Sequence, residues 1–556
     1  MGNLITTNMS ISELVDDFES GDIGVPEIQR DVVWNAEQIK DLIDSISKGF
    51  PCGSLILWEP REKDQSLLRS MVRPERLKAK LPRRFLLDGQ QRVTALASVM
   101  LERDRLRELL TEMEEELPFI FLDLRHLQRE RDWIEATTDV ANYRFPWVLH
   151  NGLFDGSVQR DPNFTRLSPN DTESVNRYVQ KFRDYKFPIQ IITDRTYAEV
   201  GEIFTRVNSD GTQLTGAEIY LARIVPHWRG IVREFRNYRR DLRDKHYDLD
   251  LTFLMRAITV VECKVPRIKE LAKRVNNGKL TRRQLNKAWK HARGATDELI
   301  RILRRDLLLD KSKFFTSKNV LVPLVYYLAK DSSAHPAARD IQRFFLFSQI
   351  SERYGAAAET ALAKDFRTLV ADSNTVRQGL TELVGDASRE ARRYYRGLRI
   401  KPDEPFGVPS KNVLLLLMYA LMRKRDATDW GSGTLKKLDE ITPDEMQLHH
   451  IFPYNFVSKN KAALKPYEEE EWTPADIRAE INDITNLTFL SRAKNAEIGD
   501  APPWEYLPNE TTLEIRKAHF IPEDPELWKP ENFYDFMIER QRLLAKAMTS
   551  LLKSLS

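Results

Sequence analysis

The sequence LHHIFP at residues 448–453 is followed by NDITNLTFL at residues 482–490, and together they indicate the fold of the C-terminal region. Only nine histidines occur in 556 residues, so two adjacent histidines ahead of an apolar residue and a proline suggest a specific role. The second stretch is typical of a turn and a short strand, and a helix is expected from Ala493 onward. This pattern predicts a β-hairpin followed by a helix.

The histidines and asparagines of this region suit metal-assisted cleavage of a phosphodiester. That reaction requires a base to deprotonate water and side chains that hold a divalent ion beside the leaving oxygen. We expect His450 to be the base, with His449 and Asn495 beside Mg²⁺ or Mn²⁺, and Asn486 to fix the hairpin and orient His450. Two alternatives stay open: His449 or Asn495 contacts phosphate instead, or the histidines are a buried, hydrogen-bonded pair with two turn asparagines.

A second motif, DGQQR, occupies residues 88–92. It follows a short apolar strand at residues 84–87 and leads into a helical run from Val93 to Leu101. A glycine turn at a helix start offers backbone N–H groups and a positive dipole end, which suits phosphate. Arg92 adds a fork-shaped donor, and Asp88 could hold a metal, a water or a ribose. The alternative is an ordinary helix cap.

The C-terminal residues carry a resemblance to a known family. The LHHIFP stretch with residues 486–490 and Asn495 resembles the HNH (His-Me finger) nuclease domain of GmrSD-type modification-dependent restriction enzymes. In that comparison Asn495 replaces the last histidine of the H-N-H pattern. The resemblance covers residues 410–510 and implies a ββα-metal nuclease domain, in which His450, Asn486 and His449 are catalytic and His449 and Asn495 bind the metal.

The DGQQR motif and its flanking segments are similar to the ParB/sulfiredoxin-like domain of GmrSD and related phage-defence proteins. The flanking segments are residues 25–30, Trp34, residues 49–55, residues 203–208 and residues 211–214. This resemblance covers residues 10–225 and implies a domain that binds and hydrolyses a nucleoside triphosphate, GTP or another, and senses modified DNA. The implied nucleotide-binding residues are Asp88, Gly89, Gln90, Gln91 and Arg92.

Composition describes a soluble globular protein with a formal net charge of only +3. The charge is unevenly distributed, because residues 224–305 contain 22 Lys and Arg against nine Asp and Glu. Such a block can attract DNA phosphates, or it can be a set of solvated helix faces. Cys52 and Cys263 are the only cysteines, too few for a four-cysteine zinc site and consistent with a cytoplasmic protein. No membrane span is expected.

We predict an α+β multidomain protein. Residues 1–225 would form the ParB-like α/β domain, residues 226–405 a basic α-helical connector, and residues 406–556 the HNH domain in a mostly helical region. A linker is expected at residues 401–407, where Pro and Gly interrupt both periodicities. Helices are predicted at residues 11–18, 35–48, 196–206, 214–223, 251–261, 282–304, 336–354, 412–425 and 534–552, and strands at residues 55–58, 85–87, 119–124 and 189–193.

The resemblance implies a type IV restriction endonuclease that defends against phage. Its expected partners are double-stranded DNA, in particular modified phage DNA, and a nucleotide that regulates cleavage. A homodimer is compatible with this hypothesis. Two rival functions are a DNA-binding regulator or partition-like clamp with a degenerate nuclease domain, and a nuclease toxin that does not discriminate between modified and unmodified DNA.

Overall fold

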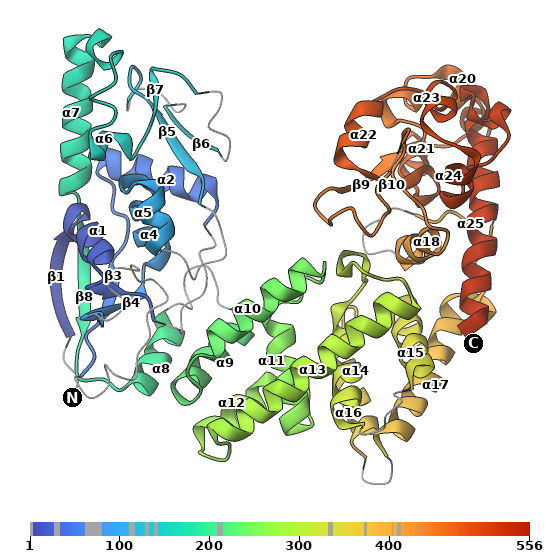
Figure 1. The fold of residues 1–556 in the computed structure, drawn as a ribbon, viewed down its shortest axis with the longest axis horizontal. Helices are drawn as coiled ribbons and strands as arrows, with labels where there is room; N and C mark the ends of the chain where they lie inside the picture. The colour runs from blue at the N-terminus through green and yellow to red at the C-terminus, as the bar shows by residue number, and fades with distance from the viewer. Residues whose placement is uncertain are drawn as a thin grey trace. The chain divides into compact units, whose positions relative to one another are not determined.

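The computed structural model describes residues 4–26, 34–61, 81–109, 117–127, 133–137, 143–207, 215–331, 337–371, 375–402, 404–407, 413–433 and 435–555. The chain divides into two compact units, Met1–Arg236 with Val275–Lys279 and Asn237–Arg274 with Leu280–Ser556. Figure 1 shows the elements of both units. The protein is mixed and multidomain, which confirms the predicted α+β fold class; the three predicted domain boundaries stay a prediction.

A five-stranded sheet is the centre of the N-terminal unit. In sheet order its strands are β1 (Leu4–Ser10), β8 (Lys186–Ile192), β3 (Leu55–Trp58), β4 (Arg84–Asp88) and β2 (Ile23–Gly24). Strand β8 pairs antiparallel with β1 and parallel with β3, so distant parts of the unit lie side by side. The predicted strands β3, β4 and β8 are confirmed. The edge strand β1 was not predicted, because its first five residues are exposed and give no apolar alternation.

Capped helices pack against strands of this unit. Helices α1 (Ile11–Ser20) and α2 (Ala36–Lys48) each begin with a capping box, whose N-cap residues are Ser10 and Asn35. The apolar residues of α2 are buried on one face, and most residues of α4 are buried. The unit also contains α4 (Gln90–Met100), α5 (Arg103–Leu109), α6 (Gly152–Asp155), α7 (Pro169–Asp184), α8 (Tyr197–Val207), α9 (Gly216–Ile224) and a second sheet of β6 (Ile134–Thr137), β5 (Phe119–Asp123) and β7 (Trp147–Leu149).

Helices dominate the middle of the chain, as predicted for the connector. They are α10 (Ile231–Asp244), α11 (Leu251–Cys263), α12 (Ile268–Asn276), α13 (Arg282–Asp306), α14 (Leu321–Lys330), α15 (Ala338–Ile350), α16 (Ala358–Leu369) and α17 (Val376–Tyr394). The three helices predicted here correspond to α11, α13 and α15. Within the described residues from 231 to 398 no strand interrupts them.

The C-terminal region surrounds one antiparallel strand pair with helices. The pair is β9 (Met446–His450) and β10 (Leu487–Ser491), and the helices are α18 (Val413–Lys424), α19 (Tyr454–Val457), α20 (Lys461–Glu469), α21 (Pro474–Ile481), α22 (Arg492–Ile498), α23 (Pro503–Glu510), α24 (Leu513–Ala518) and α25 (Phe533–Leu555). Residues 413–422 of α18 are all buried, because a helix that is apolar all round requires cover on every side.

The predicted linker is an anchored segment. Phe406 is buried, and the Gly407 N–H donates to Oδ2 of Asp483. The Gly407 carbonyl accepts from the Ile484 N–H at 3.0 Å. Proline and glycine interrupt the helix here, as the sequence indicates, but these contacts tie the segment to the loop that precedes β10.

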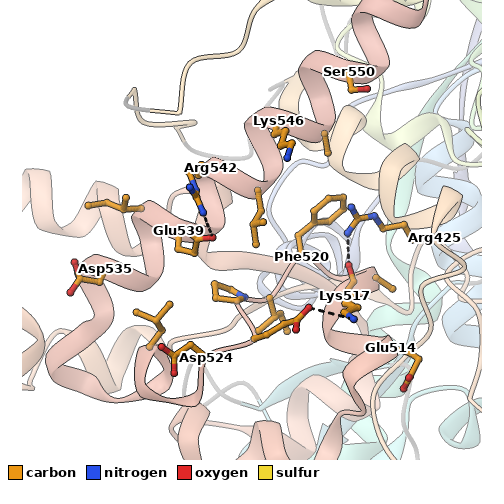
Figure 2. A pocket seen from close by; sticks show the side chains of 18 residues that line it. Arg425, Glu514, Lys517, Phe520, Asp524, Asp535, Glu539, Arg542, Lys546 and Ser550 are labelled. Carbon is orange, nitrogen blue, oxygen red and sulfur yellow. Dashed lines mark hydrogen bonds and ion pairs between the residues drawn. The ribbon is translucent and has the colours of Figure 1, made fainter.

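A groove of about 1300 Å³ lies beside α25 (Figure 2). Its apolar lining includes Phe520, Leu527 and Ile538. Cations and acids alternate around it, and Arg542 pairs with Glu539 at 2.9 Å. None of the residues predicted to be catalytic or to bind a metal lines this groove.

Candidate active site

The strands β9 and β10 form the predicted pair and lead directly into helix α22. His450 is opposite Leu487 and His449 is opposite Thr488 in the register. Ser491 then caps α22, because its side chain accepts from the Lys494 N–H. The strand–strand–helix order is therefore confirmed. The connection between the strands, residues 451–486, is much longer than a hairpin turn and contains three short helices.

His449 and Asn495 lie in contact. Nδ1 of His449 is 2.8 Å from Oδ1 of Asn495, and the amide of Asn495 donates to Oε1 of Gln447 at 2.7 Å. The ring of Trp430 packs edge-on against His449, which is only 2% exposed. Burial lowers the pKa of His449 to about 4, although the bond to Asn495 opposes this shift. The imidazole is therefore neutral at pH 7. Because Oδ1 of Asn495 can only accept, Nδ1 of His449 carries the proton in this contact, and the lone pair of the ring lies on Nε2.

His450 is oriented by Asn482. Nε2 of His450 lies 3.1 Å from Oδ1 of Asn482, whose own amide donates to the Arg478 carbonyl at 2.7 Å. Since Oδ1 can only accept, this contact places a proton on Nε2 and leaves the lone pair on Nδ1. Burial lowers the pKa of His450, so the neutral, basic form predominates at pH 7.

Asn486 fixes the backbone that follows His450. Its side chain is fully buried, accepts from the Phe452 N–H and donates to the carbonyls of Phe452 and Ile481, each at 2.9 Å. The Asn486 carbonyl also accepts from the Ile451 N–H at 2.8 Å. The expected role in fixing the strand pair matches this geometry. The direct partner of the His450 ring, however, is Asn482, which no sequence pattern singled out.

Arg540 of α25 braces the start of β10. Its guanidinium is fully buried and donates to the carbonyls of Thr485, Leu487 and His519, at 2.8 Å for Leu487. Burial lowers the pKa of Arg540 to about 9, so the side chain stays charged at neutral pH. An arginine on the apolar stripe of a helix, between Phe536 and Leu544, is the sequence signal that could have indicated this role.

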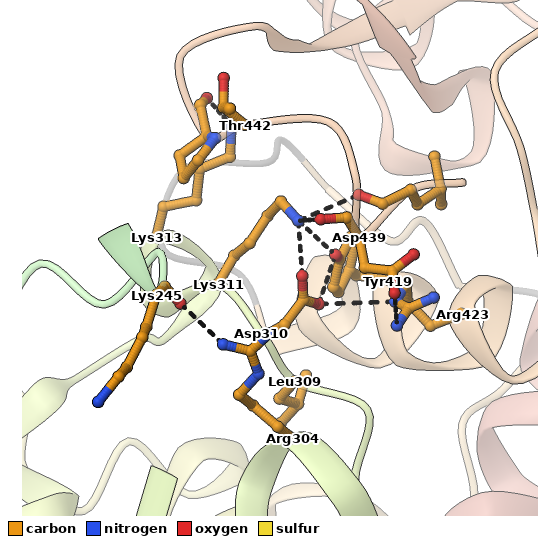
Figure 3. Close-up of polar contacts among 12 residues, drawn as sticks. Lys245, Arg304, Leu309, Asp310, Lys311, Lys313, Tyr419, Arg423, Asp439 and Thr442 are labelled. Carbon is orange, nitrogen blue, oxygen red and sulfur yellow. Dashed lines mark hydrogen bonds and ion pairs between the residues drawn. The ribbon is translucent and has the colours of Figure 1, made fainter. Parts of the chain in front are cut away.

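A buried polar cluster joins the helical region to the chain ahead of β9 (Figure 3). Lys311 is fully buried and its Nζ lies 2.6 Å from Asp310 Oδ2, 3.1 Å from Tyr419 Oη and 3.0 Å from the Leu438 carbonyl. Nearby, Lys313 donates to the carbonyl of Met446, the first residue of β9, at 3.1 Å. Residues from the helical region therefore anchor the strand that carries the two histidines.

The DGQQR motif forms the predicted turn between β4 and α4. Gly89 is the N-cap of α4 and has a φ of 90°, in the left-handed region. A Cβ added at this position would lie 2.0 Å from Cδ2 of Leu55. Both the conformation and the close approach of Leu55 therefore require glycine.

The charged members of the motif are engaged with each other. Nη2 of Arg92 lies 3.1 Å from Oδ2 of Asp88, and Nη1 donates to the Cys52 carbonyl at 2.7 Å. Oε1 of Gln91 accepts from the Trp34 N–H at 3.2 Å, and Gln90 is buried. The structure thus brings the predicted residues together around one turn, with Arg92 and Gln91 already holding partners within the protein.

Two family models match this chain in the regions just described. The model of the GmrSD restriction endonuclease N-terminal domain matches residues 11–225, and the model of the C-terminal domain of GmrSD restriction endonucleases matches residues 410–547. Together these matches cover more than half of the 556 residues. The chain belongs to the GmrSD restriction endonucleases. It is a restriction endonuclease, an enzyme that acts on DNA.

One relative matches this chain over nearly its whole length. The chain is similar to the uncharacterized protein MJ0686 of Methanocaldococcus jannaschii, with 21% identity over 611 residues and 98% of each chain covered. This similarity includes the helical region between the two GmrSD matches. The helical region is thus shared with that relative rather than added to this chain alone.

Some expectations for this GmrSD endonuclease fall outside the described residues. Residues 27–30, 208 and 211–214, which carry part of the N-terminal resemblance, are among them. Within the described ranges, no three His, Cys, Asp or Glu side chains are grouped to hold a metal ion. Every helix in those ranges is too short or too polar to cross a bilayer.

Replacing Asn482 with alanine should lower DNA cleavage by this GmrSD endonuclease about fivefold. The change removes one hydrogen bond to His450, the predicted base; that bond is worth roughly 1 kcal/mol, and without it the His450 tautomer is unselected. Initial rates of plasmid nicking measure the effect. The matched control is Asn509→Ala, because Asn509 also donates to a carbonyl four residues back, that of Glu505 at 2.8 Å. Equal rates in both variants would contradict the positioning role of Asn482.

Proposed function

We propose that this restriction endonuclease cleaves DNA at the β9–β10–α22 site by the chemistry of an HNH nuclease. The observation that carries the proposal is the contact of His449 with Asn495, 2.8 Å apart, beside a second histidine whose ring is fixed through Nε2. His450 takes the proton of the attacking water at Nδ1. Asn486 and Arg540 keep the strand pair in register during this step.

The donor set, one amide oxygen and one neutral imidazole, fits a divalent metal ion. The amide oxygen of Asn495 is a ligand type that suits Mg²⁺ or Mn²⁺, whereas imidazole is more usual with other transition metals. His449 and Asn495 would hold the ion, because their side chains lie together, with 2.8 Å between Nδ1 and Oδ1. When bound, the ion supplies Lewis-acid stabilisation of the leaving 3′ oxygen.

Tyr506 supports this use of His449. Its hydroxyl donates to the Ile451 carbonyl at 2.6 Å, so its oxygen can accept a proton from Nε2 of His449, 3.4 Å away. In that tautomer Nδ1 presents its lone pair towards Asn495. The 2.8 Å contact with Asn495 is a hydrogen bond from Nδ1–H to Oδ1, so this second tautomer would form only when a bound cation replaces that hydrogen bond.

We further propose that the N-terminal domain, with a ParB-like fold, binds a nucleoside triphosphate at residues 88–92 and regulates cleavage of modified DNA. Support comes from the glycine-started helix α4 and from the Arg92 guanidinium, both suited to phosphate. Because Arg92 is paired with Asp88, a bound phosphate would compete with Asp88 for it. Nucleotide binding would then release a carboxylate, a local change able to favour one domain arrangement over another.

One experiment tests this type IV function. Purified protein is freed of metal with EDTA and incubated with unmodified, hydroxymethylated, glucosylated or phosphorothioated DNA, with and without GTP or ATP. Mg²⁺ or Mn²⁺ should restore cleavage, and one modified DNA should be cut in preference. Cys52 and Cys263 are too few for a zinc cluster, so no structural zinc is expected. Stoichiometric, tightly bound zinc in the purified protein would therefore contradict the assignment of Mg²⁺ or Mn²⁺. Equal cutting of all DNAs would indicate a nuclease toxin that does not discriminate between them. If no DNA is cut, the protein would instead be a regulator with a degenerate nuclease domain.

Double-strand cleavage would require two such sites. A homodimer of this chain would supply both, and its presence is testable by light scattering with and without nucleotide. A monomer that only nicks DNA would contradict the dimer without affecting the site assignment.

Replacing Asn495 with alanine should lower cleavage by weakening the metal site. Part of the lost rate should return at millimolar Mn²⁺, because only one of two protein ligands is removed and mass action can offset a weaker site. Titrating Mn²⁺ against nicking rate measures the shift. His450→Ala is the comparison, since metal cannot replace a lost base. A defect in Asn495→Ala that no metal concentration relieves would favour a phosphate contact instead.

A further inference from the structure

Three lysines converge at neighbouring helix ends in the helical region. Lys264 follows the last turn of α11, Lys330 ends α14, and Lys287 lies on α13; these three helices pack side by side (Figure 1). All three lysines are exposed. Burial lowers the pKa of Lys330, Glu262 opposes the shift, and the charges of Lys264 and Lys287 lower the pKa further. The lysines are therefore close enough to repel one another.

The same face continues along α13. Arg283, Lys287 and Lys290 are four and three residues apart, so they lie on one side of the helix over roughly 10 Å. All three are exposed. Gly294 is next on this stripe, and a Cβ there would meet nothing within 4 Å. The three cations and the position of Gly294 are therefore uncovered on this side of the helix.

These five cations, which we call the basic face, differ from their neighbours in lacking carboxylate partners. Arg293 on α13 pairs with Asp241 at 3.3 Å, and Lys245 pairs with Asp297 at 3.2 Å. Across the described ranges, no carboxylate lies at ion-pair distance from any member of the basic face. Glu262 offsets part of the positive charge near Lys330, but the neighbouring lysines still repel one another, a cost that an anionic partner would lower.

We propose that the basic face, Lys264, Arg283, Lys287, Lys290 and Lys330, binds the phosphate backbone of the DNA substrate. The proposal rests on the endonuclease function. It adds a second surface, separate from the cleavage residues, that holds the DNA duplex. Phosphate contacts of this kind position DNA without reading its sequence or modification. The basic face would therefore contribute equally to modified and unmodified DNA and would weaken steeply with salt.

The test compares two triple variants that lose the same charge. Lys264→Gln, Lys287→Gln and Lys330→Gln remove the three lysines that converge at the helix ends. The control, Lys517→Gln, Arg542→Gln and Lys546→Gln, removes three exposed cations from the groove of Figure 2, where acids such as Glu523 and Glu539 accompany them. Binding of an unmodified 30-base-pair duplex is measured by fluorescence anisotropy in EDTA, over a series of salt concentrations. Thermal unfolding of each variant verifies the fold.

The basic-face variant should bind at least about tenfold more weakly at 0.1 M salt. Its plot of log affinity against log salt should be shallower by roughly 0.9 for each phosphate that is no longer neutralised. The control should change neither value.

Identical slopes in both variants would overturn the proposal, while retained cleavage would show that the nuclease function stands. Loss of binding to phosphatidylserine vesicles with an unchanged DNA slope would also overturn it, by assigning the face to a membrane surface. No DNA binding by the unmodified protein would instead contradict the endonuclease function.

Discussion

Replacing His450 with alanine is expected to lower DNA cleavage by about 10²–10⁴-fold, the usual cost of a lost general base. The residue is suited to this role because burial keeps its ring neutral and Asn482 holds the proton on Nε2. The Nδ1 lone pair is then the only basic position of the ring. Nicking of supercoiled plasmid in Mg²⁺, with the initial rate as readout, measures the loss.

Folding and DNA binding should be unchanged in this variant, because His450 is only half-buried and, within the described residues, its side chain hydrogen-bonds to Asn482 alone. Thermal unfolding and duplex binding in EDTA verify both. His227→Ala is the matched control, since His227 is an exposed histidine outside the strand pair and should cut at the normal rate. If His450→Ala keeps more than roughly a tenth of the rate, the base must be sought elsewhere.

Replacing Asp88 or Arg92 with alanine is expected to eliminate nucleotide hydrolysis and to alter cleavage of modified DNA. Arg92 would contact the phosphate of the nucleotide. In doing so its guanidinium would give up its ion pair with Asp88. The two variants should differ in binding, because Asp88→Ala frees the guanidinium, whereas Arg92→Ala removes it. Asp88→Ala should therefore bind nucleotide at least as tightly as the unmodified protein, and Arg92→Ala more weakly.

Hydrolysis and cleavage measured on the same preparations separate the steps of this proposal. Arg84→Ala is the matched control, because Arg84 lies on the same strand and pairs with Glu59 at 3.1 Å, outside the turn. Normal hydrolysis in both motif variants would reduce DGQQR to a structural cap. Hydrolysis that vanishes while cleavage of modified DNA stays unchanged would reject the regulation alone.

Local patterns in the sequence determine most of the helices and strands, including those on either side of the two motifs. A capping box at Ser10 starts α1, and a periodic apolar face marks α2, because both signals depend on residues within one or two turns. The turn at Gly89 is equally local, since glycine adopts its φ of 90° without the steric cost that a side chain adds. The segments around the paired histidines and the later asparagines likewise predict two strands and a helix, because strand patterns and helix starts depend only on residues close in the sequence.

Tertiary structure alone decides which atoms meet across the chain. Asn482 rather than Asn486 faces the His450 ring, Arg540 braces β10 from the last helix, and Lys313 holds the start of β9. The partners of Arg92 come from Asp88 nearby and from the Cys52 carbonyl 40 residues away. A hydrogen bond depends on a donor and an acceptor within about 3 Å, and no sequence pattern fixes that distance between remote segments. Burial, which lowers the pKa of both histidines, also depends on how those segments pack.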